Sequence, residues 1–438
     1  MPRWNRKKKS QAKNEIPSSS NPAVVPSDNL TAVASLRAVS SNPSDAPKIA
    51  ELDPIELRKL AKQHAEFGPL GDPSHLYKSE HPGGEIPDPV LDEPPYFIAL
   101  TTYISFLVLI FLGHFHDYFA KWFRSHTYRH LRPQNGYASL YSDFESFYTR
   151  RLKQRINDCF ERPTTGVPGR YITLLDQTSE DNLHFQLTGT TTDTLNLSSY
   201  NYLGFAQSEG PCSDFAEETI RRDGISMAGS CSEAGTSKLH LEAIIDKVRF
   251  TNAGQVFGEA PAPSVLAQIY SSLRLIADED PLHPGQGIER VQRLAFNSRY
   301  LRLGLKRLGF IVYGHDDSPI VPLMLYNPAK MPAFSHEMLR RKISVVVVTY
   351  PATPLELSRA RFCVSAAHTK DDLDRILRVC DEIGDALELK YSTGVAGGLR
   401  DPPSDKDLKG GKKTIEPPRW NIEEVIERGT RDAKLPLY

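Results

Sequence analysis

The stretch ISVVVVTYPATPLELSRARFCVSAAHT, residues 343–369, decides the fold of this chain. Residues 343–348 are dominated by valine, and such a β-branched run is typical of a strand that is buried on both faces. Pro351 and Pro354 end the run, because proline cannot donate to the hydrogen-bond ladder of a sheet. Residues 361–365 then predict a second short strand, with Arg361 leading into it.

An amphipathic helix is predicted directly after these strands. Thr369 and Asp372 have the spacing of a capping box, in which each side chain bonds a backbone N–H of the first turn. The apolar residues that follow recur every three or four positions, as on one face of a helix. They are Leu373, Ile376, Leu377, Cys380, Ile383 and Leu387.

The same periodicities predict helices and strands along the rest of the chain. Strands are expected at residues 171–175, 195–197, 310–313 and 320–326, and helices at 140–159, 213–223, 264–277, 288–308 and 331–342. The inward residues of helix 264–277 are expected to be Val265, Leu266, Ile269, Leu273 and Ile276. The charged residues of helix 288–308 indicate a solvated face: Glu289, Arg290, Arg293, Arg302, Lys306 and Arg307. Residues 281–390 therefore predict a small α+β domain, with helices on one face of a largely antiparallel sheet.

Arg361 is the candidate ligand-binding residue. Burying an unpaired guanidinium beside an apolar strand is costly, so this side chain should meet an anion. A guanidinium binds a carboxylate through two parallel hydrogen bonds, which favours a small carboxylic acid as the guest. The pattern alone leaves open the alternative of an internal ion pair with a nearby Asp or Glu.

The motif RFCVSAAHT, followed by an acidic helix, resembles the C-terminal signature of the α-oxoamine synthases. These pyridoxal-phosphate enzymes join an amino acid to an acyl-CoA with loss of CO2. The similarity extends over about residues 90–428 and is greatest to the serine palmitoyltransferase branch. It implies an α/β fold of the fold-type I pyridoxal-phosphate transferases, which resemble class I/II aminotransferases, with a small C-terminal domain at 281–390.

The resemblance also implies substrate-binding roles for two residues. Arg361 would hold the carboxylate of the amino acid. Asn201, in the turn NYLG at 201–204, matches a position that contacts the acyl donor in some relatives. An asparagine before a turn is also an ordinary backbone cap, so that role has a simpler alternative. For this branch the substrates are L-serine and palmitoyl-CoA, and the product is 3-ketosphinganine, a precursor in sphingolipid biosynthesis.

The resemblance is interrupted between Glu242 and Ala243. In the family, the block that follows supplies a histidine that stacks on the pyridine ring, an aspartate at the ring nitrogen and the Schiff-base lysine. None of these motifs occurs in this sequence, and Lys238 and Lys247 lack the required loop context. Residues 137–280 therefore indicate a truncated remnant of the large cofactor-binding domain, with no catalytic residue. An error in the exon assignment of the gene, a spliced transcript and a genuine protein all fit this pattern.

Residues 96–113 form the clearest apolar stretch, with no charged side chain. At about 1.5 Å rise per residue, such a helix is just long enough to cross a bilayer. Acidic residues precede it and basic residues follow it, which places the C-terminal domain in the cytosol. The resemblance makes the endoplasmic reticulum the expected membrane. The alternative is a buried helix or one lying in the membrane plane. Soluble relatives that act on glycine or alanine need no such anchor.

Composition bounds the remaining possibilities. A net charge of -1 gives no basis for nucleic-acid binding. The five cysteines stand singly, so neither a metal site nor a disulfide framework is predicted. Residues 1–95 are poor in aromatic side chains and predict disorder. Residues 391–438 predict a Gly-, Pro- and Lys-rich tail, with a short helix at 420–428.

Two functional hypotheses follow. In the first, the chain is a subunit of a membrane-bound serine palmitoyltransferase heterodimer, whose first subunit lacks the Schiff-base lysine; this chain alone would then be inactive. In the second, it is a non-catalytic, membrane-anchored pseudoenzyme that binds the same complex.

Overall fold

A computed structural model describes residues 72–79, 93–123, 126, 128–139, 141–151, 153–181, 184–208, 210–225, 262–350, 352–392 and 420–431. The interruption at residues 242 and 243, the lysines at 238 and 247, and most of the N-terminal region and of the tail lie outside these ranges. Residues 72–79, within the region expected to be disordered, include the short 3-10 helix η5 (Pro73–His75). His75 of this turn stacks on Phe296 with ring centroids 5.2 Å apart.

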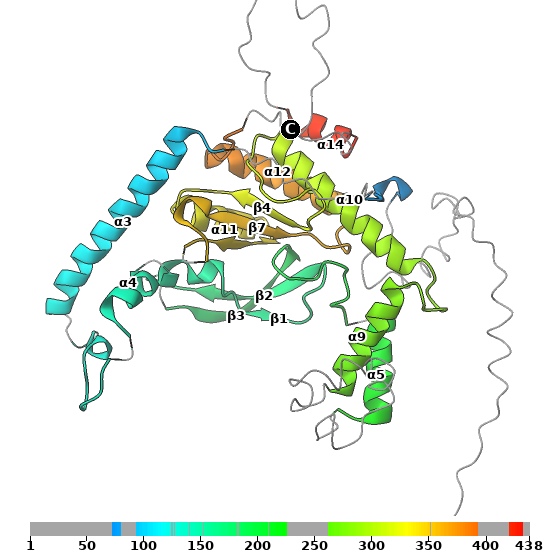
Figure 1. Ribbon diagram of the computed structural model, residues 1–438, viewed down its shortest axis with the longest axis horizontal. Coiled ribbons are helices and arrows are strands. Elements are labelled where there is room, and N and C mark those ends of the chain that lie inside the picture. The colour runs from blue at the N-terminus through cyan, green and yellow to red at the C-terminus, as the bar shows by residue number, and fades with distance from the viewer. Residues whose placement is uncertain are drawn as a thin grey trace, which may run out of the picture. The chain divides into compact units, whose positions relative to one another are not determined.

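Two sheets organise the structure (Figure 1). The first has the order β1 (Thr164–Thr165), β2 (Tyr171–Thr178), β3 (Gln186–Asn196) and β5 (Ile343–Ser344). The second has the order β4 (Ile320–Met324), β7 (Arg359–Cys363) and β6 (Val346–Val348). All pairs are antiparallel except β3 with β5, which is parallel.

The valine run that was predicted as one strand divides between the two sheets. Ile343 pairs with Leu195 of β3, whereas Val346 pairs with Arg361 of β7. Val345 lies between the two strands and is 1% exposed. The prediction of a single strand was therefore wrong, although the expected burial holds for residues 343–345 and for Val347. The run links the sheets because its two halves bond different neighbours.

The predicted strand at residues 310–313 is reduced to an isolated bridge between Val312 and Leu323. Pro322 explains the interruption. Its carbonyl accepts from Tyr313 N at 3.1 Å, but its own nitrogen carries no hydrogen to return the bond.

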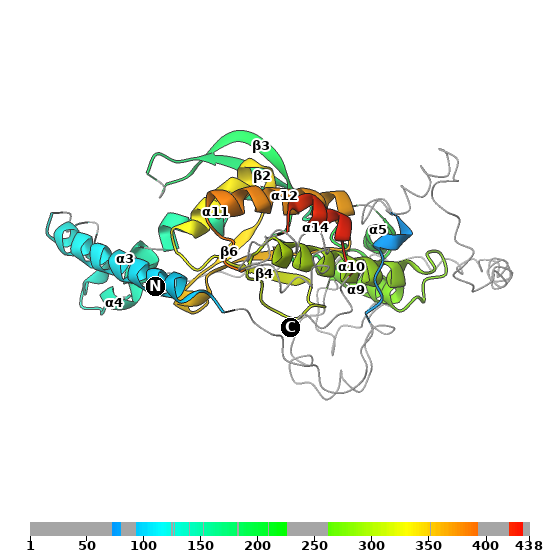
Figure 2. The same cartoon turned by 90° about the horizontal axis from the view of Figure 1, so that it is seen from above.

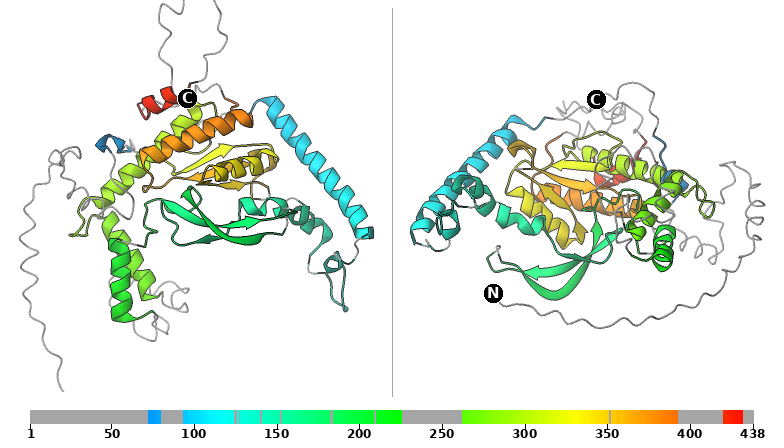
Figure 3. Two further views of the ribbon diagram at one scale, coloured as in Figure 1. Left: turned by 180° about the vertical axis from the view of Figure 1, so that it is seen from behind. Right: turned by 60° about the horizontal axis from the view of Figure 1, so that its bottom comes forward.

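Three helices pack the core against these strands: α10 (Gln286–Arg307), α11 (Lys330–Arg340) and α12 (Lys370–Ala386). Figure 3 shows α11 against the sheet that contains β7, in agreement with its contacts to β6 and β7. The capping box of Thr369 and Asp372 is confirmed. The predicted apolar face of α12 is buried from Leu373 to Ile383, and Leu387 is half-buried. The short helix α14 (Ile422–Arg428) lies beside α12 (Figure 2).

The charged residues of α10 are buried, contrary to the predicted solvated face. Arg290, Arg302 and Arg307 are each 0% exposed. Backbone carbonyls of other segments accept hydrogen bonds from these guanidinium groups. Arg290 donates to Leu203 O at 2.7 Å, and Arg307 donates to Gly429 O at 2.6 Å. The prediction failed because the spacing of residues along a helix does not show which carbonyl groups other segments bring to it. Arg293 and Lys306 are also buried, and Glu289 is half-buried.

Helix α9 (Pro263–Ile276) packs on α5 (Pro211–Asp223) with a different face from the predicted one. Leu266 is buried as expected, and its neighbour Ala267 joins it against Phe215 and Ala216 of α5. The other residues predicted to point inward are exposed: Val265, Ile269, Leu273 and Ile276. The inward assignment was therefore wrong for four of five residues, because α5 covers only one side of α9.

Helix α3 (Tyr96–Phe123) has 28 residues and extends beyond the predicted apolar stretch. By length and composition it could cross a membrane. Most of its large apolar side chains are exposed, but Thr102 and Phe106 are buried, and Asn327 donates to Ser105 Oγ at 3.4 Å. One stripe of its first half therefore contacts the folded domain. The helix predicted at 140–159 is divided into α4 (Asp143–Arg151) and the 3-10 helix η7 (Lys153–Cys159).

Candidate functional site

Arg361 lies in the middle of β7, where its backbone pairs with Pro322 on one side and Val346 on the other. Its guanidinium carbon lies 4.5 Å from the centroid of the Tyr200 ring, and Nη1 donates to the hydroxyl of the same tyrosine. Nη2 donates to the carbonyl of Ser198 at 3.2 Å. The turn after β3 therefore holds this side chain in place through a ring and a carbonyl.

No carboxylate pairs with Arg361 among the residues that the structure describes. Its Nε is buried and has no hydrogen-bond partner. A buried donor without a partner carries the desolvation cost that an anionic guest would remove. The internal ion pair that the sequence left open is thus not found in the described part of the chain, and the arginine remains available to a carboxylate.

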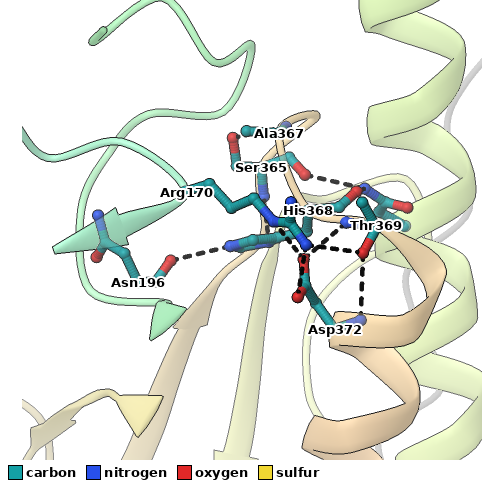
Figure 4. Close-up of polar contacts among 8 residues, drawn as sticks. Arg170, Asn196, Ser365, Ala367, His368, Thr369 and Asp372 are labelled. Carbon is teal, nitrogen blue, oxygen red and sulfur yellow. Dashed lines mark hydrogen bonds and ion pairs between the residues drawn. The ribbon is translucent and has the colours of Figure 1, made fainter. Parts of the chain in front are cut away.

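A buried polar network stands at the turn between β7 and α12 (Figure 4). His368 is 1% exposed; its Nδ1 accepts from Ser365 N at 3.1 Å, and its Nε2 lies 3.0 Å from the Asn196 carbonyl. That carbonyl can only accept, so Nε2 carries the hydrogen. Burial lowers the pKa of His368 to about 4, which keeps the ring neutral at physiological pH.

An ion pair closes the other side of this network (Figure 4). Arg170 Nε lies 2.7 Å from Asp372 Oδ2, and Arg170 Nη2 donates to Thr369 Oγ1 at 3.1 Å. Burial alone would raise the pKa of Asp372, but the hydrogen bonds from Arg170 and from the Thr369 backbone outweigh it and hold the pKa below its usual value. The helix cap thereby also binds the segment that precedes β2.

Asn297 of α10 completes the arrangement by donating to the carbonyls of Ser365 and His368 at 2.9 and 2.8 Å. The network therefore fixes the turn that follows β7 against β3 and α10, and so positions the strand that carries Arg361. Sequence reasoning predicted the cap formed by Thr369 and Asp372 but missed Arg170, His368 and Asn297. The only signal was a histidine inside an apolar motif, which does not reveal its distant partners.

Asn201 lies next to the turn that holds Arg361, but its side chain is engaged internally. Its Nδ2 donates to Pro168 O at 3.2 Å, and its Oδ1 accepts from Ala206 N at 3.0 Å. These contacts correspond to the backbone-cap alternative. The contact of Asn201 with an acyl donor stays a prediction.

This chain is similar to an aminotransferase family model and to several serine palmitoyltransferases. Residues 240–379 match the sequence profile of the family "Aminotransferase class I and II". Serine palmitoyltransferase 2 of Schizosaccharomyces pombe is 36% identical over an alignment of 572 residues that covers 90% of this chain and 94% of the relative. The protein of the same name from Saccharomyces cerevisiae is 34% identical, with 91% and 99% covered. A solved serine palmitoyltransferase of S. paucimobilis aligns with 57% of this chain and 99% of its own, at 14% identity and a TM-score of 0.43.

The alignments with the S. pombe and S. cerevisiae proteins are longer than this chain. The alignment with the S. pombe protein spans 572 residues, whereas this chain has only 438. Long stretches of the relative must therefore stand opposite no residue of this chain.

Proposed function

We propose that this chain, which belongs to the serine palmitoyltransferase 2 family, is a subunit of an enzyme that condenses L-serine with palmitoyl-CoA to 3-ketosphinganine. The relatives from S. pombe and S. cerevisiae are at least 34% identical to it over nearly their whole length. The reaction would place the protein in sphingolipid biosynthesis. The second, finer part of the proposal is that this polypeptide supplies serine recognition but lacks the groups that perform the chemistry.

Arg361 carries the proposal of serine recognition. Its guanidinium is oriented by Tyr200 and by the Ser198 carbonyl, and its Nε is buried without a partner. In this arrangement a serine carboxylate would receive charge-assisted hydrogen bonds from a donor group that is already held in position. The role of Arg361 is thus to bind and orient the amino acid.

Pyridoxal phosphate is the cofactor of this family, but the described residues around Arg361 do not form a site for it. Within the described ranges, no lysine amine and no carboxylate contacts Arg361. The Arg361 guanidinium can hold an amino-acid carboxylate, yet the groups around it offer neither an imine-forming amine nor a partner for a ring nitrogen. We therefore assign no reaction step to this chain alone.

Helix α3 supports membrane attachment, which suits an acyl donor and a product that partition into lipid. The helix exposes a long apolar surface, including Leu107, Phe111 and Phe115. We propose the endoplasmic reticulum as the membrane and the cytosol as the location of the C-terminal domain. The contact of its first half with the folded domain favours a helix that lies along the membrane over one that crosses it.

A non-catalytic subunit is the second candidate, and the long alignments favour it for the polypeptide as it stands. A chain that lacks stretches present in its relatives could still bind the first subunit of the enzyme. Sequencing the transcript across the codons of Glu242 and Ala243 separates the two: an uninterrupted additional coding block there would make the complete product a catalytic subunit.

Co-expression tests the activity directly. The chain, with and without the central block of its S. pombe relative inserted after Glu242, is expressed with the first subunit, and 3-ketosphinganine formation from L-serine and palmitoyl-CoA is measured. We expect product only with the insertion. Product from neither form, in complexes shown to be assembled, would contradict the proposed activity.

A further inference from the structure

A cleft of about 590 Å³ lies between the first sheet and the end of α11, apart from Arg361 and the residues that contact it. Its cationic side chains are Arg162, His336, Arg340 and Lys342, and its acidic ones are Asp158 and Asp176. Asp158 is already engaged, because its Oδ2 lies 2.5 Å from His336 Nε2. Asp176 accepts from Thr190 Oγ1 at 2.8 Å. Arg340 is likewise paired, with Glu337, which leaves Arg162 and Lys342 to set against Asp176. The cleft thus keeps an excess of positive charge.

Arg162 has a hydrogen-bond donor in this cleft that no acceptor satisfies. Its Nη2 donates to the buried Ser335 hydroxyl at 2.9 Å, but its Nη1 is buried and has no hydrogen-bond partner. Burial lowers the pKa of this guanidinium, yet at neutral pH it stays charged. A buried charged donor without an acceptor is costly, and an anion in the cleft would supply the acceptor.

The rest of the lining is apolar and extends away from these charges. Leu174 and Leu175 of β2 form one wall, together with Phe185, and Leu339 of α11 forms another. A volume of about 590 Å³ exceeds what a bare phosphate occupies and falls within the ordinary range for small-molecule pockets. The shape therefore suits a ligand with a charged head and an aliphatic body.

We propose that this cleft binds an amphiphilic anion, a phosphate or carboxylate on an aliphatic tail, with Arg162 and Lys342 contacting its head. Such a ligand is distinct from the serine that Arg361 is proposed to hold.

A metal ion is the competing occupant. Asp158, Cys159 and His336 place ligand-type atoms within 4.8 Å of one another, a grouping that the sequence did not predict because His336 is far from the other two in the chain. Arg162 argues against it, because a guanidinium beside these donors repels a cation. The ion pair of Asp158 with His336 accounts for their proximity without a metal.

Binding of hexyl phosphate to the purified full chain tests the proposal, with hexanoate, inorganic phosphate, hexanol and zinc as the comparison probes. The short tail limits partition into the detergent that α3 requires, and calorimetry at fixed ionic strength gives the affinities. We expect hexyl phosphate to bind at least about tenfold more tightly than inorganic phosphate, because several methylene groups become buried. If hexanoate also binds, the head group of the natural ligand can be a carboxylate. If hexyl phosphate binds and hexanoate does not, the head group is a phosphate. Either result supports the site.

Two variants locate the ligand. Arg162→Met and Lys342→Met should each weaken hexyl phosphate binding by about tenfold, whereas Lys78→Met, an exposed lysine outside the cleft, should leave it unchanged. Lys342 is exposed, so its variant remains informative if Arg162→Met fails to fold. Equal binding of hexanol, inorganic phosphate as tight as hexyl phosphate, no effect of Lys342→Met, or stoichiometric zinc binding in place of the anion would each overturn the proposal.

Discussion

Arg361 is held by an aromatic ring and a carbonyl, and this kind of support determines what the residue can do. An arginine paired to a carboxylate is already satisfied, whereas the Nε of Arg361 is buried and unbonded. The ring of Tyr200 restricts the guanidinium without neutralising its charge. The side chain is therefore prepared for an anion before one arrives.

Replacement of Arg361 should impair serine use in a form of the chain that carries the relative's central block. Arg361→Ala should weaken serine binding by about 2 to 4 kcal/mol, because the carboxylate loses its charged partner. Arg361→Lys should recover only part, since an ammonium cannot bind a carboxylate through a planar pair of donors. The measurement is kcat/KM for serine in the presence of the first subunit. Identical serine dependence in all three proteins would show a purely structural arginine.

His368 should make stability depend on pH. Its pKa is about 4 in the folded protein against 6.5 as the ordinary value, so the unfolded chain binds the proton first as the pH falls. Its contribution is complete above pH 6.5 and should decline by about 3 kcal/mol on going to pH 4. Urea unfolding at several pH values measures this loss, and His368→Gln should show a smaller one.

Other histidines do not obscure that comparison. The pKa of His75 is lowered too, by burial, but its effect is common to both proteins. The raised pKa of His336 gives stability that is fully present below pH 6.5 and is lost only as the pH rises toward about 9. Equal pH slopes for the wild type and His368→Gln between pH 4 and 6.5 would refute the assignment.

At the scale of elements, α10 acts as a clamp because its arginines bond to carbonyls of distant segments. Arg302 donates to the carbonyls of Tyr313, Gly314, Ser318 and Ile320, and burial lowers its pKa to about 10. One side chain thus closes the whole loop that leads into β4.

Arg302→Met should destabilise the protein by about 3 kcal/mol, because several buried carbonyls lose a charged donor together. Chemical unfolding of the variant and the wild type gives the difference. The matched control is Arg378→Met, which removes an exposed pair with Glu423 and should change stability within experimental error. Similar effects of both substitutions would mean that the carbonyl contacts contribute little.

The sequence patterns predicted where helices and strands form better than they predicted which side chains those elements bury. The capping box and the apolar stripe of α12 are local, so Thr369, Asp372 and Leu373 could be placed from spacing alone. The faces of α9 and α10 depend on what other segments bring to them, which a helical period does not contain. The candidate site shows the same limit: Arg361 was identified from its motif, but Tyr200 lies 161 residues away and became visible only in the fold.

Helix α3 should attach the chain to membranes through its exposed apolar face. The double variant Leu107→Lys with Phe111→Lys places two charges on that face, where both side chains are more than 60% exposed. In cells without the first subunit, it should move from the membrane pellet to the soluble fraction. The control, Leu187→Lys with Val167→Lys, alters exposed apolar residues elsewhere and should remain in the pellet. Retention of both variants would assign the attachment to another segment.

At the scale of the whole molecule, two helices that follow residues 242 and 243 in the chain leave apolar side chains exposed. The stripe Val265, Ile269, Leu273 and Ile276 of α9 is exposed, and Ile288 and Val291 at the start of α10 are exposed as well. Contiguous apolar surface of this kind usually marks an interface. We propose that the block predicted to be missing after Glu242 covers this stripe in the complete protein.

The polypeptide as written should therefore fold in its C-terminal part without becoming an enzyme. Residues 281–390 hold most of the buried core, and β3 and the turn after it bond to them. Purified protein mixed with pyridoxal phosphate should show no imine absorption, because the resemblance to the family predicts that the Schiff-base lysine belongs to the block missing after Glu242. It should also form no 3-ketosphinganine from L-serine and palmitoyl-CoA, even with the first subunit present. The form with the relative's central block inserted after Glu242 is the matched control and should gain both properties. Serine-dependent turnover by the uninserted polypeptide, with no intact copy of the subunit in the preparation, would show that the interruption removes nothing essential.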